Sequence, residues 1–280
     1  MYKNLLIPAM SLLLVVSSYV QSQTIGDFEY DETALYAETK QVNQFFRRFN
    51  GEEDKRGERI YEDDKDFHSY KLRKKYVPLL FNLESTILND ALKEKFIDLV
   101  LDEDNPILLA FHGGNWFTEL ETVFLYKGKE EELTLFLRLQ EEKVGSKWVI
   151  DGVYFEPFYK TLKKPDNSNF NDKKFLHPLS HEVGFMNIFR VFNDPDSLEY
   201  FGYHDYKPDY LSLFFYEVKI GNLKFKTVKT QKFHFFQIDG WYFELTYFNR
   251  DGLNSGWLIS NLIELDERNR EILLNYIYHE

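Results

Sequence analysis

The chain has no cysteine among its 280 residues, and this absence excludes disulfides as a source of stability. Stability has to come from ordinary hydrophobic cores, for which the chain is long enough. The sequence also lacks a Gly-rich phosphate loop, a metal-ligand set and the Gly-x-Ser-x-Gly motif of esterases. We therefore predict no catalytic residue, no metal site and no cofactor.

Negative charge is in excess, with a formal net charge of −12 at pH 7. An acidic surface is repelled by the phosphates of nucleic acids and by anionic lipids, so neither is an expected partner. Aromatic residues are plentiful, since 27 Phe and 19 Tyr contribute to an aromatic share of 18%. That composition favours well-filled, β-rich cores.

The N-terminus carries an apolar stretch at residues 5–16, preceded by Lys3. Val20 and Ser22 suit the positions before a cleavage, so residues 1–22 are interpreted as a signal peptide. A transmembrane anchor is the alternative, but the stretch is shorter than the ~20 residues that a span requires. We expect an exported protein, periplasmic or secreted, with no membrane insertion after cleavage.

A short phrase occurs twice, at residues 42–50 and 185–193. In both copies apolar residues recur at the spacing of one helical face: Val42, Phe45, Phe46 and Phe49, then Phe185, Ile188, Phe189 and Phe192. Each copy precedes a strand-rich block, and the blocks align at an offset of 109 residues, the separation of Trp148 and Trp257. We interpret the chain as two tandem modules, residues 23–162 with a charged insertion and residues 175–280.

The expected elements follow from periodicity. Helices are predicted at residues 35–50, 85–101 and 266–278, and the charged stretch 51–75 is predicted to be a solvated helix or loop. Strands are predicted at 107–111, 116–126, 133–140 and 148–155 in the first module, and at 211–219, 223–228, 232–238, 241–248 and 257–265 in the second. The fold class is therefore α+β.

Two groups of residues carry a resemblance to a known family. They are Phe45-Phe46-x-x-Phe49 with Gly145-Ser146-Lys147-Trp148-Val149-Ile150, and their counterparts Ile188-Phe189-x-x-Phe192 with Asn254-Ser255-Gly256-Trp257-Leu258-Ile259. This arrangement resembles the nuclear transport factor 2-like cone fold, which ketosteroid isomerase-like enzymes and many exported bacterial domains of unknown function share. The resemblance implies two cone-like modules, each a helix packed on a curved antiparallel sheet. It transfers no catalytic motif, because a fold does not carry function by itself.

His234 and Glu244 invite an acid–base pairing, which the predicted strand register argues against. Asp239-Gly240 suits a two-residue type I′ turn that pairs Ile238 with Trp241. In that register His234 lies opposite Leu245, and Glu244 points to the other face of the sheet. The sequence therefore predicts no dyad.

The same register predicts a candidate binding site. It places four residues on one face: His234, Trp241, Phe243 and Tyr247. If that face is concave, it forms an aromatic pocket with one titratable group, suited to an amphipathic ligand or a sugar. The alternative is a histidine in the core or on the outer surface.

Three further motifs have simpler interpretations. His112-Gly113-Gly114 is expected to be a turn, and residues 102–105 a solvated helix end. His177 and His181 have the spacing of two helical metal ligands, but Pro178 and the lack of a further ligand favour a helix-entry loop.

The sequence predicts an exported, non-catalytic binding protein whose partner is a small amphipathic ligand or another protein. One alternative is a ketosteroid isomerase- or dehydratase-like enzyme with a single general base in an apolar cone. The other is a scaffold or interaction protein whose cones are filled by Phe and Tyr.

Overall fold

The computed structural model describes residues 41–54, 56–143, 145–162, 188–203, 206–250 and 254–279. All of these residues belong to one compact unit. The predicted signal peptide and the motif of His177 and His181 lie outside the described residues.

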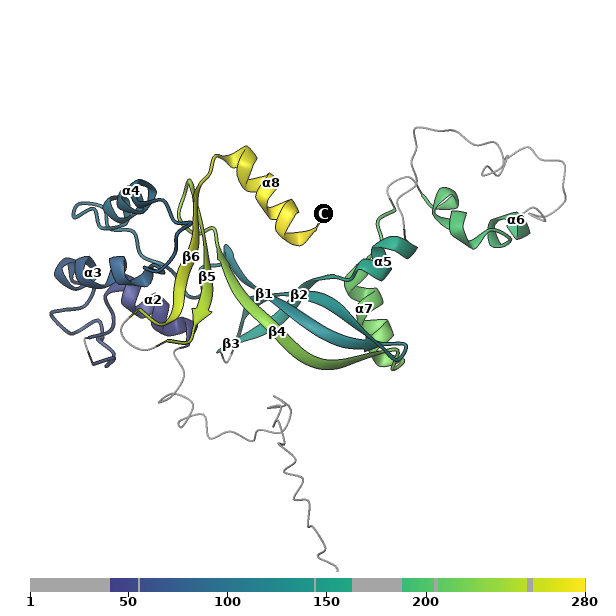
Figure 1. The fold of residues 1–280 in the computed structure, drawn as a ribbon, viewed down its shortest axis with the longest axis horizontal. Coiled ribbons are helices and arrows are strands. Elements are labelled where there is room, and N and C mark those ends of the chain that lie inside the picture. The colour runs from purple at the N-terminus through teal and green to yellow at the C-terminus, as the bar shows by residue number, and fades with distance from the viewer. Residues whose placement is uncertain are drawn as a thin grey trace, which may run out of the picture. The chain divides into compact units, whose positions relative to one another are not determined.

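The described strands form one six-stranded antiparallel sheet in the order β3-β2-β1-β4-β5-β6 (Figure 1). Their bounds are β1 Trp116–Tyr126, β2 Lys129–Glu142, β3 Gly145–Tyr154, β4 Leu223–Phe235, β5 Trp241–Phe248 and β6 Gly256–Glu264. Each half of the chain contributes three consecutive strands, and the halves meet where β1 pairs with β4. The α+β class is confirmed, and the strands of the two predicted modules join in a shared sheet.

Helices precede, connect and follow the strands. They are α2 Val42–Asn50, α3 Tyr70–Tyr76, α4 Asp90–Val100, α5 Glu156–Thr161, α6 Phe189–Phe192, α7 Tyr210–Lys219 and α8 Glu267–Tyr278, with 3-10 turns η1 Val77–Leu80 and η4 Pro195–Phe201. Side chains cap three of the helix starts, because Asn89, Asp209 and Asp266 each accept a hydrogen bond from a backbone N–H in the first turn. Among the described helices, none is sufficiently long and apolar to span a membrane.

One face of the sheet, here called the aromatic face, is covered at one end by α2, α3 and α4. Phe45, Phe46 and Phe49 of α2 are buried there against Phe235 and Phe243 of the sheet. Buried side chains such as Phe124 and Leu223 continue this face at the other end, under α5 and α7. The apolar face predicted for residues 42–50 is therefore the inward side of α2.

A buried arginine ties the helices over the aromatic face together. Arg73 of α3 is 1% exposed and donates to the backbone oxygens of Phe49, Val100 and Ile107. Gly51 ends α2 with a φ of +74°, and a Cβ there would lie 2.9 Å from Cγ of Arg73. Glycine therefore supplies both the left-handed turn and the room for the arginine.

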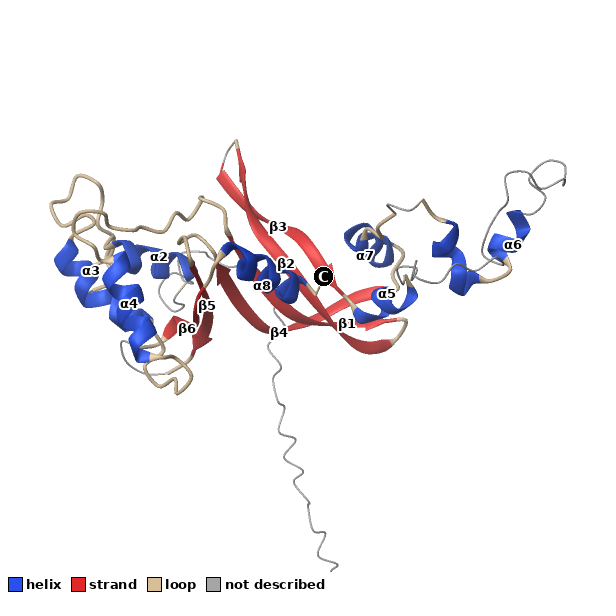
Figure 2. Cartoon of the chain, turned by 90° about the horizontal axis from the view of Figure 1, so that it is seen from above, coloured by secondary structure: helices blue, strands red, loops and turns tan. Residues whose placement is uncertain are grey.

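The opposite face, here called the α8 face, carries α8 across part of its surface. Figure 2 shows α8 lying over the sheet between the α2–α4 group and the α5–α7 group. Phe117, Phe136, Phe236 and Tyr242 of this face form a cluster with Ile277 of α8. The predicted C-terminal helix is confirmed and begins after its N-cap, Asp266.

Several predicted elements are wrong. Residues 211–219 form α7 rather than a strand, because Asp209 caps a helix whose apolar residues lie on both of its sides. Residues 107–111 form no strand, and the strands predicted at 223–228 and 232–238 are one strand, β4. The second copy of the repeated phrase also differs, since Ile188, Phe189 and Phe192 are exposed rather than buried.

The predicted register of β4 and β5 is wrong by one residue. Trp241 N–H donates to the Ile238 carbonyl, but of the two central turn residues only Gly240 has a positive φ, whereas a type I′ turn needs both. β4 ends at Phe235, and Phe236 N–H donates to Asn115 instead of continuing the β4–β5 ladder. As a result His234 pairs with Glu244, and both side chains point to the α8 face.

Candidate functional site

The register separates the four residues of the predicted binding site. Trp241 and Phe243 are buried in the core of the aromatic face, where they pack under α2 and α4. Tyr247 is half-exposed beside Trp257, with ring centroids 5.4 Å apart. Of the four residues, only His234 lies on the α8 face. The structure therefore does not bring these four residues into one pocket.

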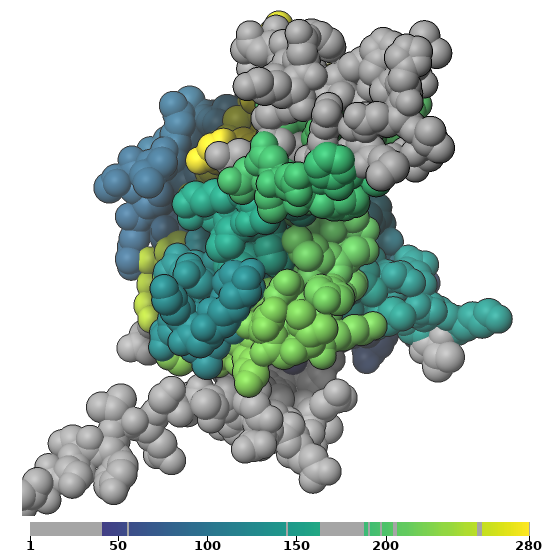
Figure 3. Space-filling view, turned by 90° about the vertical axis from the view of Figure 1, so that its right-hand side faces the viewer, coloured from purple at the N-terminus to yellow at the C-terminus, as the bar shows by residue number. Residues whose placement is uncertain are grey.

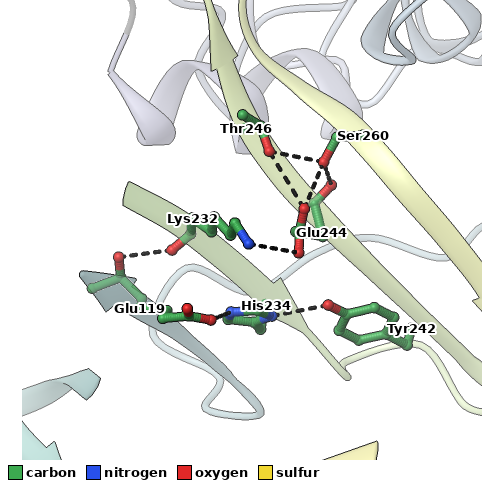
Figure 4. Close-up of polar contacts among 8 residues, drawn as sticks. Glu119, Lys232, His234, Tyr242, Glu244, Thr246 and Ser260 are labelled. Carbon is green, nitrogen blue, oxygen red and sulfur yellow. Dashed lines mark hydrogen bonds and ion pairs between the residues drawn. The ribbon is translucent and has the colours of Figure 1, made fainter. Parts of the chain in front are cut away.

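His234 is instead the centre of a buried line of hydrogen bonds (Figure 4). Its Nε2 lies 2.8 Å from Oε2 of Glu119, and its Nδ1 lies 2.9 Å from the hydroxyl of Tyr242. A neutral ring satisfies all three groups if Tyr242 O–H donates to Nδ1 and Nε2–H donates to Glu119. Glu119 reaches His234 because β1 pairs with β4, so that Phe117 is opposite His234 and Glu119 is opposite Lys232.

Ionisation in this line is fixed by its surroundings. Burial raises the pKa of the Tyr242 hydroxyl, and the charges of Glu244 and Glu119 raise it further, so the hydroxyl keeps its proton. Burial also raises the pKa of the Glu119 carboxyl. The hydrogen bond from His234 and nearby positive charge, such as that of Lys232, outweigh burial, and the pKa of Glu119 lies below its usual range. Glu119 is therefore a fixed carboxylate at neutral pH.

Glu244 is held by a separate set of contacts. Its carboxylate accepts hydrogen bonds from the hydroxyls of Ser260 at 3.0 Å and Thr246 at 3.4 Å. Lys232 Nζ lies 4.0 Å from the same carboxylate (Figure 4). Although His234 and Glu244 are direct cross-strand neighbours, no hydrogen bond joins their side chains within the described structure. The partner of His234 is Glu119.

A hollow of about 610 Å³ opens beside Glu119, between β1, β2, β4 and the end of α8. Its carboxylates are Glu119, Glu121, Glu130, Glu131, Glu132 and Glu156, and its cationic or titratable partners are Lys232 and His279. Apolar side chains share the wall, among them Tyr154 and Ile277, and the Tyr154 ring stacks on His279 at 3.8 Å. The hollow therefore combines apolar surface with concentrated negative charge.

Neighbouring lysines neutralise only part of this charge. Ion pairs join Glu130 to Lys226, Glu132 to Lys229 and Glu156 to Lys160. Glu121 and Glu131 make no ion pair with any residue that the structure describes. The hollow thus retains at least two unneutralised carboxylates beside the fixed charge of Glu119, and this field attracts cations.

A second hollow, of about 450 Å³, lies between β2, β3, the start of α7 and the last turns of α8. Arg138 Nε contacts Asp151 Oδ2 at 2.5 Å, and its Nη2 donates to the Tyr278 hydroxyl at 3.0 Å. Burial raises the pKa of Tyr278 to about 12, although Arg138 opposes the shift. Arg138 and Asp151 compensate each other, and the remaining charged residue of the lining, Asp209, caps α7, so this hollow concentrates less negative charge than the first.

The arrangement supports few kinds of chemistry. Among the described residues, no group of three or more His, Asp or Glu side chains has the geometry of a metal site. Glu119 is a weak base because its pKa is lowered, and Tyr242 is a weak acid because its pKa is raised. The site is better suited to holding a cation than to moving a proton.

Sequence reasoning found His234 but missed Glu119 and Tyr242. Glu119 and Glu121 are the two charged residues of β1 and stand two apart, so their side chains form a polar stripe on one face of the strand. The stripe could have been noticed. Its contact with His234 could not, because it depends on β1 pairing with β4 across more than 100 residues.

Comparison with known proteins adds no family to this picture. The chain matches no family model, no curated protein and no solved structure. Function has to be argued from the geometry of the α8 face.

Proposed function

We propose that this protein is an exported, non-catalytic binding protein, and that the hollow beside Glu119 takes a small amphipathic cation or a cationic segment of a protein partner. The observation that carries the proposal is the hollow itself, where unneutralised carboxylates lie next to apolar side chains. Its volume of about 610 Å³ falls within the range of small-molecule sites.

Preorganisation supports this role. His234 and Tyr242 hold the Glu119 carboxylate in one orientation, so a ligand would not have to order it. Glu121 is half-buried, which reduces the screening of its charge by water. An alkyl chain could lie along Tyr154 and Ile277 while its cationic head group meets these carboxylates.

The enzyme alternative has weaker support. A general base in an apolar cone works best when its pKa lies near the working pH, which requires a raised carboxyl pKa. The pKa of Glu119 is lowered instead, and its carboxylate already accepts a hydrogen bond from His234. We rank proton-transfer catalysis below binding for this reason.

We further propose that the two halves are tandem copies of one module related to the nuclear transport factor 2-like cone. Supporting this, each half has a helix before three consecutive antiparallel strands and a helix after them: α4 and α5 around β1–β3, then α7 and α8 around β4–β6. The proposal predicts that a solved homologue of either half will superpose on the other half in the same strand order.

Titration calorimetry with octylammonium and octanoate tests the binding proposal. The two probes share an alkyl chain and differ in charge, so we expect a heat of binding from octylammonium only. Glu121→Gln should weaken the binding of octylammonium about fivefold, because one unneutralised carboxylate is lost. Glu103→Gln, an exposed carboxylate outside the hollow, is the matched control and should bind as the unaltered chain does. Equal affinity for both probes, or no effect of Glu121→Gln, would contradict the proposal.

A further inference from the structure

The sheet ends in a surface that the proposed ligand site does not use. We call it the α7 end and define it as residues 126–129, with the β1–β2 turn, and residues 210–229, with α7 and the first part of β4. Figure 3 looks onto it, with the teal hairpin next to the light-green start of β4. Lys127 N–H donates to the Asn222 carbonyl at 2.9 Å, and Tyr126 pairs with Leu223, so these segments form one continuous tip.

Large apolar side chains are exposed over the α7 end. Each of five is between 40% and 57% exposed: Phe215, Tyr216, Val218, Ile220 and Phe225. The inner side of α7 is already packed against the sheet, because Phe214 is buried among Phe124 and Leu223. A helix that is apolar on both sides is normally covered on both sides.

The exposed rings continue the core outward. The ring centroids of Phe225 and Phe124 lie 5.5 Å apart, those of Phe124 and Phe214 5.8 Å apart, and those of Phe214 and Phe215 5.7 Å apart. This chain of contacts fixes Phe215 and Phe225 on a rigid support. The exposed apolar surface is therefore presented by packed elements.

Charge at the α7 end is opposite in sign to that of the whole chain. The two segments contain one carboxylate, Glu217, and six lysines: Lys127, Lys129, Lys219, Lys224, Lys226 and Lys229. Three further carboxylates, Glu130, Glu131 and Glu132, follow directly on β2 and border this end on the side of the hollow. Lys226 and Lys229 pair with Glu130 and Glu132, whereas the other four lysines make no ion pair with a described residue. Glu217 accepts a hydrogen bond from Asn222 Nδ2 at 2.8 Å. A chain of net charge −12 thus carries a locally basic tip.

We propose that the α7 end docks on the surface of an anionic lipid membrane. Lysines attract anionic head groups, and aromatic and aliphatic side chains settle at the boundary of the acyl region. The acidic remainder of the chain is repelled, which orients the molecule with this tip toward the lipid. Net charge alone predicts repulsion from such lipids, and the segregation of lysines removes that objection. The inference is independent of what the hollow binds.

A second copy of the chain is a poorer occupant. In a two-fold dimer the same patch faces itself, so tip-to-tip contact would bring Lys127, Lys219 and Lys224 near their own counterparts. An anionic surface matches the same lysines without that repulsion. Charge complementarity therefore favours lipid.

Sedimentation of the full chain with vesicles tests the docking. Vesicles of phosphatidylcholine alone serve as the background, and vesicles with equal parts phosphatidylglycerol provide the anionic surface. We expect at least tenfold stronger binding to the anionic vesicles. The difference should disappear in about 0.5 M salt, because that salt concentration screens the charges. Lys219→Glu with Lys224→Glu should weaken anionic binding at least tenfold, since each lysine contributes about fivefold.

The control replaces two exposed lysines of α3, Lys71→Glu with Lys74→Glu, and should leave vesicle binding unchanged. Tyr216→Ser with Phe225→Ser tests the apolar contribution and should weaken binding to anionic vesicles while the thermal unfolding midpoint stays close to that of the unaltered chain. Equal binding to both vesicle types, or equal losses in the α3 control, would overturn the proposal. So would a dimer in light scattering that only Tyr216→Ser with Phe225→Ser dissociates, because that result assigns the surface to a second copy.

Discussion

The aromatic face and the α8 face are built from the same strands, yet they hold the sheet in different ways. On β4 the side chains of Phe233 and Phe235 point to the aromatic face, while Lys232 and His234 point to the α8 face. The aromatic face is stabilised by close packing of rings, such as Phe235 on Phe243 at a centroid distance of 4.6 Å. The α8 face has polar groups that each need a partner.

The difference teaches where a binding site can form. The helices over the aromatic face bury its rings, and a deeply buried charge there, Arg73, serves three backbone carbonyls. On the other face α8 covers Phe117 and Tyr242, but the stripe from Glu119 to Glu121 remains beside an open hollow. Incomplete cover over a polar stripe leaves charge available to a ligand.

The largest effect is expected from Phe235→Ala on the aromatic face. Phe235 is fully buried between Trp116 and Phe243, so the variant leaves a large cavity and should lower the free energy of unfolding by about 4 kcal/mol. Urea unfolding measures this loss in the free energy of unfolding. Phe225→Ala removes the same side chain from an exposed position on the same strand and should cost less than about 1 kcal/mol. Similar losses in the two variants would contradict this packing.

An intermediate effect is expected from His234→Ala on the α8 face. The variant leaves the Tyr242 hydroxyl and the Glu119 carboxylate without their shared partner, at a cost of about 2 kcal/mol. His112→Ala, at an exposed histidine that contacts Ser146, provides the comparison and should change stability by less than about 0.5 kcal/mol. If both histidines prove equally dispensable, the buried network does not exist as described.

A smaller, pH-dependent effect is expected from Glu119→Gln. The folded pKa of Glu119 is below its usual value of 4.5, so its carboxylate stabilises the fold above that pH, by about 1 kcal/mol. This contribution is lost as the pH falls through the folded pKa, and Gln has no such loss. Thermal unfolding of both proteins from pH 7 to pH 3 should therefore show a difference in unfolding midpoint that narrows in acid. A difference that widens in acid would mean that the folded pKa of Glu119 is raised, which contradicts this account.

Local patterns predicted the elements whose signals are self-contained. Strands β1 and β5 occupy the predicted residues 116–126 and 241–248, and α8 follows the predicted cap at Asp266. The repeated phrase shows the limit of such patterns. Its first copy is buried as α2, whereas the described residues of its second copy include exposed Phe189 and Phe192. Similar sequences pack differently because the burial of a residue depends on what the rest of the chain places nearby.

The candidate site was hidden by contacts between distant segments. Gln237 leaves the β4–β5 ladder because its side chain donates to the carbonyls of Ala110 and Gly114, and Phe236 N–H bonds to Asn115. These contacts moved the register by one residue and turned His234 to the face opposite Trp241 and Phe243. Asp-Gly is a strong hairpin signal, but here tertiary hydrogen bonds decided where the strand ends.

The most direct test of this account is nitrogen-15 NMR of the His234 ring, recorded with and without octylammonium. We predict a neutral ring with its proton on Nε2 and a bare Nδ1 that accepts from Tyr242. Octylammonium should shift the Nε2 resonance through Glu119, and octanoate should leave it unchanged. A proton on Nδ1, or a ring that does not respond to the cation, would contradict both the network and the binding site proposed beside it.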